Sequence, residues 1–458
     1  MTISPSEIDL RTYTSATQRL LAHSGFELSG NTADAARWDI DHIHTYLGHH
    51  DRPDDRPTVH VAGSKGKGSI ATMTEALLRF ALPAVAGAAR TMLNTSPDLH
   101  TARERISFDG VAITPGQFAQ IAERVLAESA TERWSYFELL TVMAWHAAAD
   151  ARCAWQVLEV GLGGRLDTTN AISSKAVAVI APIDREHTAI LGETIPEIAA
   201  EKAGIIIGPC EVVISPQRAS ALDPIREVAA AAGATTHEIA EECTLRVSNS
   251  SLNAVEFDLR TPERTYRKLQ VQLLGQHQAE NAATAVRAAE LALAAQGIEL
   301  NEVVAREALA QVQLPGRGEV IRQHPLTIVD GAHTALAAKR LRQALNQSSV
   351  PKPQVIILGL LNDKDADSIT RALVSPADQV IVYAPAHPRA ADPSEIKVLV
   401  RATGATVTTA PNIAVALERG TALAGERGAL IVTGSMYSVA EAREALLAIS
   451  GDRALGLR

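Results

Sequence analysis

The sequence predicts an α/β protein built from two units. Short β-branched runs alternate with longer segments rich in alanine and leucine, which is typical of a parallel sheet covered by helices. The chain has 458 residues, of which 46% are apolar and 21% charged, and this length provides for two or three domains. A stretch rich in glycine and lysine, HVAGSKGKGSIATM at 60–73, joins the first strand run to a helical pattern.

The predicted strands form two series along the chain. The first series lies at 58–63, 156–161, 176–183 and 210–215, and the second at 326–333, 354–360, 379–385 and 429–435. Between them, 252–275 alternates like strands and precedes two predicted helices at 278–297 and 300–312. We therefore place a boundary near residue 298, which gives units of 1–297 and 298–458.

The remaining sequence features exclude several classes of protein. A net charge of −9, with Lys and Arg spread along the chain, argues against a nucleic-acid partner and leaves small charged ligands. Cys153, Cys210 and Cys243 stand far apart, which argues against a zinc site or a disulfide framework. With no signal-peptide pattern and no apolar run of membrane length, we expect a cytoplasmic protein without a membrane partner.

We expect the first fifteen or so residues to be loose and a helix around 35–48.

The stretch after the first strand has the pattern of an anion-binding loop. The helix that follows it carries Ile70, Met73, Leu77 and Phe80 on one face. Glycines let the backbone approach phosphate oxygens, and the helix N-terminus adds partial positive charge. The residues expected to bind the phosphates of ATP are Gly63, Ser64, Lys65, Gly66, Lys67, Gly68 and Ser69. The alternative is a glycine-rich turn with two solvated lysines.

The loop is a variant of the common phosphate-loop pattern, because Gly68 separates Lys67 from Ser69. Lys67 can reach the terminal phosphates, and the Ser69 hydroxyl can bind a magnesium ion. Further motifs follow in order: NTSPDLHTARERI (94–106), SYFELLT (135–141), EVGLGGRLDTTN (159–170), HTAILGETIPEIAAEKAGII (187–206), LLGQHQAEN (273–281), LPGR (314–317), DGAH (330–333), DKD (363–365), PRA (388–390) and GSMY (434–437).

With this ordered set, the chain resembles the folylpolyglutamate synthase/dihydrofolate synthase family of the Mur ligase superfamily over about residues 35 to 445. The resemblance implies an N-terminal P-loop ATPase-like domain of the Mur ligase central type, with a mostly parallel sheet and a small β region. It also implies a C-terminal Rossmann-like glutamate ligase domain. The implied enzyme is a monomeric ATP-dependent ligase that adds L-glutamate to folate or dihydropteroate through an acyl phosphate, with two Mg²⁺ ions.

The resemblance also implies roles for individual residues. Ser69 and Ser96 would hold the first magnesium ion; Glu159 and His187 would hold the second. Glu159 lies at the end of a predicted strand, where α/β sheets place their ligands. Taken alone, Glu159 would be a capped turn acid and His187 a surface histidine; their place beside a phosphate loop favours the metal role. The expected catalytic residues are Lys67, Glu159, His187 and Lys202.

Lys202 follows a helix-start signal, because Thr194 and Glu197 have the spacing of a capping box. Ile195, Ile198 and Lys202 then lie on one inward face. Burial lowers the pKa of a lysine and makes the amine reactive. The resemblance implies that Lys202 is carbamylated and supports the second metal ion, whereas the alternative is that its side chain extends past the isoleucines to water.

The resemblance places the remaining site residues at the two ends of the substrates. Phe137 and Asp167 match positions around the pterin, where an aromatic face and a carboxylate suit a flat heterocycle; a core Phe and a turn Asp are the alternatives. Arg165 is expected to be structural only. The second domain is expected to close over ATP, and the residues expected to bind ATP beyond the loop are Asn281, Arg317, Asp330 and His333. Lys364, Asp365, Arg389 and Tyr437 are weaker candidates.

Two other functions stay open. A Mur ligase acting on a nucleotide-linked peptide usually carries a separate domain before the phosphate loop, and the segment before residue 58 is short for one. A P-loop kinase or ATPase without ligase chemistry would leave GRLD, the block at 187–206 and the second α/β unit without a purpose.

Overall fold

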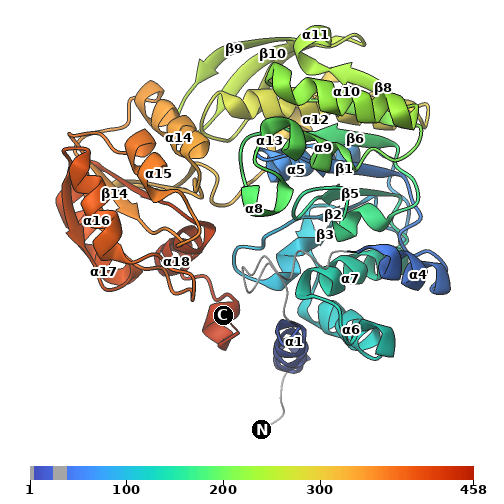
Figure 1. Cartoon of the computed structure of the whole chain (residues 1–458), viewed down its shortest axis with the longest axis horizontal. Coiled ribbons are helices and arrows are strands. Elements are labelled where there is room, and N and C mark those ends of the chain that lie inside the picture. The colour runs from blue at the N-terminus through green and yellow to red at the C-terminus, as the bar shows by residue number, and fades with distance from the viewer. Residues whose placement is uncertain (1–4, 24–38, 458) are drawn as a thin grey trace.

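The computed structural model describes residues 5–23 and 39–457, which form two lobes, each built on its own sheet (Figure 1). The sheet of the first lobe has eight strands in the order β4 (Val111–Ala112), β3 (Ile106–Phe108), β2 (Thr91–Asn94), β5 (Trp155–Glu159), β1 (Thr58–Ala62), β6 (Val177–Ile180), β7 (Glu211–Ile214) and β8 (Thr235–Glu238). Strands β2, β5, β1, β6, β7 and β8 are parallel, and β3 and β4 add an antiparallel edge.

The central strand β1 is buried along its whole length because helices cover both faces of the sheet. Val59 and Val61 point to the face packed by α5 (Lys67–Ala81), α12 (His277–Ala294) and α13 (Glu302–Ala310). The opposite face packs against α4 (Asp41–His49), α6 (Pro115–Leu126), α7 (Tyr136–Asp150), α9 (Ile195–Ala203) and α10 (Ala219–Ala232). This double coverage explains why every position of β1 is buried, instead of every second one.

A small antiparallel sheet completes the first lobe, with the order β11 (Thr265–Val271), β10 (Val255–Arg260) and β9 (Thr244–Ser250). Val255, Phe257 and Leu259 alternate inward and join the core that contains α12. The predicted alternation in 252–275 is thus confirmed, and β9 lies outside that range. The helix after it, α13, packs in the same core, and the boundary near residue 298 stays a prediction.

The second lobe has six strands in the order β12 (Glu319–Gln323), β13 (Leu326–Asp330), β17 (Ala429–Thr433), β14 (Gln354–Leu358), β15 (Gln379–Val382) and β16 (Thr406–Thr409). All pairs are parallel except β12 with β13. Helices α14 (Ala335–Gln347), α15 (Ala366–Leu373) and α16 (Pro393–Ala402) cover one face, and α17 (Ile413–Ala424) and α18 (Met436–Leu447) the other. The second predicted strand series is therefore confirmed as a separate, doubly covered sheet.

The expectation of a loose N-terminus is wrong for residues 5–15, because α1 (Pro5–Leu21) is a helix of seventeen residues. Tyr13, Ala16 and Leu20 are buried on one face of α1, and the Tyr13 ring meets Phe118 of α6 with 5.2 Å between centroids. Polar residues between them mask the periodicity. In the helix predicted around 35–48, α4 begins at Asp41, and residues 35–38 lie outside the described part of the chain.

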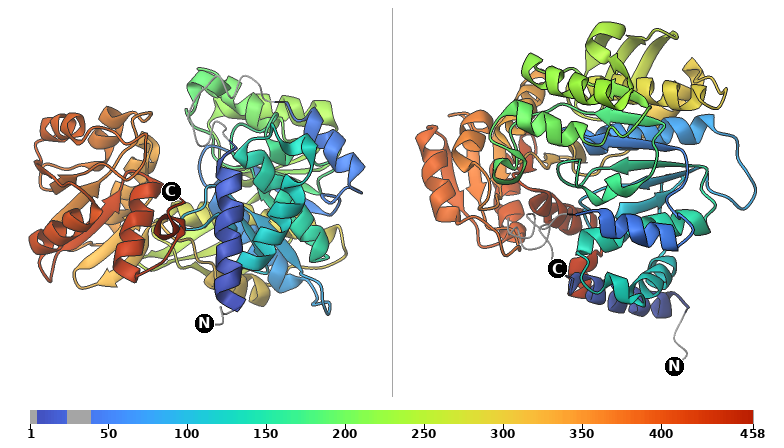
Figure 2. Two further views of the ribbon diagram at one scale, coloured as in Figure 1. Left: turned by 90° about the horizontal axis from the view of Figure 1, so that it is seen from below. Right: turned by 45° about the vertical axis from the view of Figure 1, so that its right-hand side comes forward.

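The C-terminal end of the chain returns from the second lobe to α1 of the first lobe (Figure 2). Asp452, in the short helix η4 (Asp452–Leu455), is fully buried. Its carboxylate accepts hydrogen bonds from the Tyr13 hydroxyl at 2.8 Å and the Ala102 N–H at 3.0 Å. This contact ties the C-terminal end of the chain to the first lobe. Among the described residues, none of the helices combines the length and the apolar character that a membrane span requires.

Candidate active site

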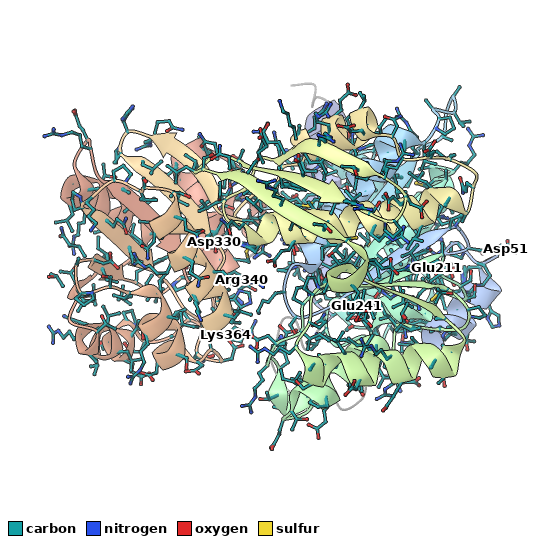
Figure 3. All side chains as sticks on the ribbon, turned by 90° about the horizontal axis from the view of Figure 1, so that it is seen from above. Asp51, Glu211, Glu241, Asp330, Arg340 and Lys364 are labelled. Atoms are coloured by element: carbon teal, nitrogen blue, oxygen red, sulfur yellow. The ribbon has the colours of Figure 1, made fainter. Side chains whose placement is uncertain are left out.

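A cavity of about 910 Å³ lies between the two lobes. Figure 3 shows Asp330, Arg340 and Lys364 on the edge of the second lobe that faces the first. The cavity is lined by most of the site residues expected from the sequence, namely Ser64, Lys65, Gly66, Lys67, Gly68, Ser69, Ser96, Phe137, Glu159, Asp167, His187, Asn281, Arg317, Asp330 and His333. Gly63 and Lys202 lie behind this wall, joined to each other by a hydrogen bond.

The glycine loop ends β1 and begins α5, as the sequence predicts. A Cβ on Gly63 would stand 2.6 Å from the Cβ of Ala181, and Gly66 has a φ of +82° at the N-cap of α5. Both positions therefore require glycine. The N–H groups at the start of α5 have no carbonyl partner within the helix, so they are available to an anion. The N–H groups of Ser64 and Lys65 instead donate to the Pro182 carbonyl, at 3.0 Å each.

Three oxygen-bearing side chains meet beside the start of α5. Ser69 is buried in the first turn, Glu159 ends β5, and Ser96 follows β2. The Glu159 Oε2 accepts a hydrogen bond from the Ser96 N–H at 3.1 Å. Burial raises the pKa of Glu159, and the charge of Lys67 opposes that shift. Within the described residues, no lysine or arginine lies within ion-pairing distance of this carboxylate, and such oxygen donors suit a divalent cation such as Mg²⁺.

His187 lies at the N-terminal end of the short helix α8 (Thr188–Leu191), with a φ of +46°. Burial lowers the pKa of His187 to about 4, and the Glu186 carboxylate partly offsets this shift. The imidazole is therefore neutral at physiological pH, which is the form that can bind a metal ion. No cluster of three or more His, Cys, Asp or Glu ligands occurs in the described part of the chain, so a metal ion here relies also on serine hydroxyls.

Lys202 is buried, with 1% of its surface exposed, on α9. The predicted capping box of Thr194 and Glu197 is present at the start of that helix. The Lys202 Nζ donates to the Glu186 Oε1 at 2.9 Å and to the Gly63 carbonyl at 3.1 Å. The alternative in which Lys202 extends to water is therefore wrong, because its amine is buried and binds the Gly63 carbonyl and the Glu186 carboxylate.

Glu186 links Lys202 to the phosphate loop. Its second oxygen lies 3.5 Å from the Lys65 Nζ. Burial raises the pKa of Glu186, but Lys202, Lys67 and Lys65 lower it by more, so the carboxyl stays ionised. The loop and α9 are thus held together by one buried carboxylate between two lysines.

Phe137 and Asp167 lie together on the wall of the cavity, both beside Gly161. The Phe137 ring packs on Gly161, where a Cβ would stand 2.5 Å from its Cζ. Asp167 is buried and accepts hydrogen bonds from the Leu162 and Thr169 N–H groups, at 2.9 and 3.0 Å. Burial raises the pKa of Asp167, and these hydrogen bonds oppose the shift. An aromatic face beside a buried acceptor suits a flat ring with N–H groups.

The second lobe brings Arg317, Asp330 and His333 to the cavity. Burial raises the pKa of Asp330 to about 6, and Arg317 opposes the shift. Burial lowers the pKa of His333 to about 3, and its Nδ1 donates to the Gly331 carbonyl at 2.7 Å. Asn281, which the predicted boundary near residue 298 assigns to the first unit, lies on α12 and packs against Gly66 of the first lobe.

The weaker candidates divide into two groups. Lys364, Arg389 and Tyr437 line the cavity, with the Lys364 Nζ bound to Asp363 at 2.7 Å. Asp365 caps α15 through the Ser368 N–H. Arg165 forms an exposed ion pair with Glu201, which agrees with a structural role.

Sequence reasoning missed several cavity residues. His42 and Glu138 form a hydrogen bond of 3.0 Å at one end, with the ring of Trp134 edge-on to His42. His277 and Arg340 also line the cavity. Glu138 carried a signal, because Ser135 and Glu138 form a capping box, but its partner on α4 lies 96 positions away.

Comparisons with known proteins agree with this geometry. Residues 61–289 match the Mur ligase middle domain, and residues 316–436 match the Mur ligase, glutamate ligase domain. The dihydrofolate synthase/folylpolyglutamate synthase of Mycobacterium tuberculosis is 32% identical over 425 residues, which cover 84% of this chain and 85% of that protein.

Solved structures show the same architecture. The M. tuberculosis folylpolyglutamate synthase complexed with ADP has a TM-score of 0.84 at 30% identity, covering 96% of this chain and 99% of that one. A bifunctional folylpolyglutamate synthase/dihydrofolate synthase from Yersinia pestis, complexed with AMPPNP and a Mn ion, has a TM-score of 0.77 at 27% identity and covers 89% and 93%. The chain therefore belongs to the dihydrofolate synthase/folylpolyglutamate synthase family of Mur-type ligases.

Proposed function

We propose that this protein is an ATP-dependent ligase that joins L-glutamate to a folate-type carboxylate and releases ADP and phosphate. The acceptor is tetrahydrofolate, dihydropteroate or both. The observation that carries the proposal is the single cavity in which the glycine loop, buried oxygen donors and the Phe137–Asp167 pocket meet between two lobes. The family membership of the chain supports the same reaction.

The ATP end of the cavity binds the nucleotide through both lobes. The glycine loop, Lys67 and the start of α5 hold the phosphates, because their N–H groups and ammonium group are matched to an anion. The amide of Asn281 lies against the loop and reads the adenine. Arg317 meets phosphate oxygens, Asp330 accepts from the ribose hydroxyls, and His333 lies near the phosphates.

Two magnesium ions fit the donors beside the loop. Ser69 and Ser96 would hold the first, and Glu159 and His187 the second; bound there, they would neutralise the phosphate charge during transfer. A carbamate on Lys202 would support the second ion. In this structure the amine is paired with Glu186, so that carbamylation requires the pair to separate.

The chemistry proceeds in two transfers. The acceptor's carboxylate attacks the γ-phosphorus, the bond to ADP breaks, and an acyl phosphate forms. The glutamate nitrogen then attacks the acyl carbon, an amide bond forms, and phosphate leaves. Lys67 stabilises the phosphoryl oxygens, Phe137 and Asp167 orient the acceptor, and closure of the lobes keeps water from the acyl phosphate.

The division of labour between the lobes is also part of this proposal. Residues 1–297 carry the glycine loop that binds ATP. Residues 298–458 add Arg317, Asp330 and His333 to the ATP site and carry the glutamate side, where Lys364, Arg389 and Tyr437 line the cavity. We further propose that the enzyme works as a monomer in the cytoplasm.

The direct test is ADP release by the purified protein with Mg-ATP and L-glutamate, comparing dihydropteroate with tetrahydrofolate as acceptor. We expect release that requires both glutamate and an acceptor, and that is lost in Lys67→Ala. ADP release that is independent of glutamate and of both acceptors would instead indicate an ATPase and overturn the proposal.

A further inference from the structure

A buried histidine lies behind the Phe137–Asp167 end of the cavity. His60 is the middle residue of β1, and its side chain is fully buried. Val59 and Val61 point to the α5 side of the sheet, so His60 points to the opposite face. There its Nε2 lies 2.8 Å from the Oγ1 of Thr169, in the short helix η3 (Thr168–Ala171). No step of the proposed reaction uses this ring.

The histidine is the first member of a hydrogen-bond chain that ends at Asp167. The Thr169 hydroxyl lies 2.5 Å from the Asp167 Oδ1 and has one proton to donate. Thr169 donates that proton to Asp167, so its hydroxyl oxygen must accept from His60. The network thus assigns the proton of the neutral ring to Nε2. Burial lowers the pKa of His60, which agrees with a neutral ring.

The two carboxylate oxygens of Asp167 differ in the hydrogen bonds that they accept. Oδ1 accepts from both the N–H and the hydroxyl of Thr169, on the protein side. From the part of the chain that the structure describes, Oδ2 accepts one hydrogen bond, from the Leu162 N–H at 2.9 Å. A carboxylate oxygen can accept a second, and Asp167 lines the cavity. The remaining capacity for a ligand N–H therefore lies on Oδ2.

The buried His60 ring lowers the stability of the fold, and its packing does not explain why it is there. Its Nδ1 is buried and has no hydrogen-bond partner among the described residues. Burying an unpaired polar atom destabilises a fold, and an apolar side chain in β1 would avoid that penalty. The gain from the histidine therefore lies in the hydrogen bond that it donates to Thr169.

We propose that His60, acting through Thr169, is a positioning residue that fixes the Asp167 carboxylate and directs its Oδ2 toward the N–H edge of the acceptor's heterocycle. This inference rests on the proposed function, because Asp167 is the group that meets the acceptor. It deepens that function by making acceptor recognition depend on a hydrogen-bond chain that begins in the central strand β1.

The test compares steady-state kinetics of the full-length enzyme with each substrate varied in turn. Thr169→Val removes the hydroxyl at constant shape, and His60→Leu removes the first donor. For each, we expect the KM for the acceptor to rise about tenfold while the KM values for ATP and glutamate stay within about twofold. Thr169→Ser and His60→Gln keep a donor and should restore the acceptor KM to within about threefold of the wild type.

Two further measurements separate positioning from mere structure. The double variant His60→Leu/Thr169→Val should be no worse than either single variant, because both break one chain. The melting temperature of His60→Leu should equal or exceed that of the wild type. The matched control is His146→Leu, since His146 is a buried histidine bonded to the Tyr46 hydroxyl at 3.0 Å and lies outside the cavity lining. It should leave the three KM values unchanged.

The failure of this inference differs from the failure of the proposed function. Wild-type protein without acceptor-dependent turnover overturns the proposed function, and the inference falls with it. An active wild type whose Thr169→Val variant keeps the wild-type acceptor KM, or raises the three KM values alike, overturns the inference alone. Should His60→Leu fail to fold, the pair Thr169→Val and Thr169→Ser decides the question.

Discussion

Lys202 and Lys175 are two buried lysines of the first lobe, and their amines bind different kinds of partner. Lys202 is 1% exposed and Lys175 is 6% exposed. The Lys202 amine binds the Glu186 carboxylate, whereas the Lys175 amine donates to the Asn170 side-chain oxygen at 2.7 Å and the Ile205 carbonyl at 2.6 Å. Of these two lysines, only Lys202 therefore has an anionic partner among the described residues.

The difference shows that burial alone does not identify a functional lysine. Burial lowers the pKa of both lysines, and that of Lys175 falls to about 7. Lys202 adjoins the phosphate loop through Gly63 and reaches the cavity wall through Glu186. Lys175 instead fastens the segment after η3 to the end of α9. We therefore propose a role in the reaction for Lys202 and a structural role for Lys175.

The largest expected effect is on turnover in Lys202→Ala. We expect the rate to fall by on the order of a thousandfold, because the site loses the group that would carry the carbamate. The measurement is acceptor-dependent ADP release, with circular dichroism to confirm that the variant folds. Lys175→Met should retain turnover within about twofold of the wild type. A Lys202→Ala enzyme with a near-normal rate would remove the distinction between the two lysines.

A smaller effect is expected on the stability of Glu186→Gln. The substitution leaves the Lys202 ammonium buried without its carboxylate, and breaking a buried pair in this way costs about 3 kcal/mol of unfolding free energy. Urea denaturation at pH 7 measures the change. The matched control is Glu201→Gln, because Glu201 pairs with Arg165 near the surface. Equal losses of unfolding free energy in the two variants would show that the buried pair stabilises the fold no more than the surface pair does.

The pH dependence of stability should report Lys175. The pKa of Lys175 is about 7 in the folded state and near 10.5 when unfolded. Between these two pKa values Lys175 is protonated in the unfolded chain and neutral in the folded one. The unfolding free energy should therefore rise by about 1 kcal/mol for each pH unit, and this gain should be lost again as the pH falls toward 7. Urea titrations from pH 7 to 9 measure this slope. It should be smaller in Lys175→Met; an unchanged slope would show that Lys175 does not titrate in this range.

The smallest effect is expected for Arg165→Ala. Arg165 pairs with Glu201 at 2.9 Å, but its side chain is 56% exposed. Solvent screens such a pair, so the unfolding free energy should change by less than about 1 kcal/mol and turnover should stay within about twofold of the wild type. A large loss in either measurement would extend the site to the exposed side of α9.

Local patterns predicted much of this molecule. The two strand series, the glycine loop and the inward position of Lys202 were readable because each depends on residues within a few turns of one another. The helix α1 was missed because few apolar residues mark its buried face. The pair formed by His42 and Glu138 was missed because its members lie 96 positions apart.

Local patterns are enough to predict a strand that ends in an anion-binding loop, a capped helix that turns a lysine inward, and two successive α/β units. The groups that those residues meet depend on how the chain folds in three dimensions. Lys202 finds Gly63 139 positions away, and His60 finds Thr169 109 positions away. The physical reason is that sheet register and helix packing set such contacts, and neither leaves a trace in local periodicity.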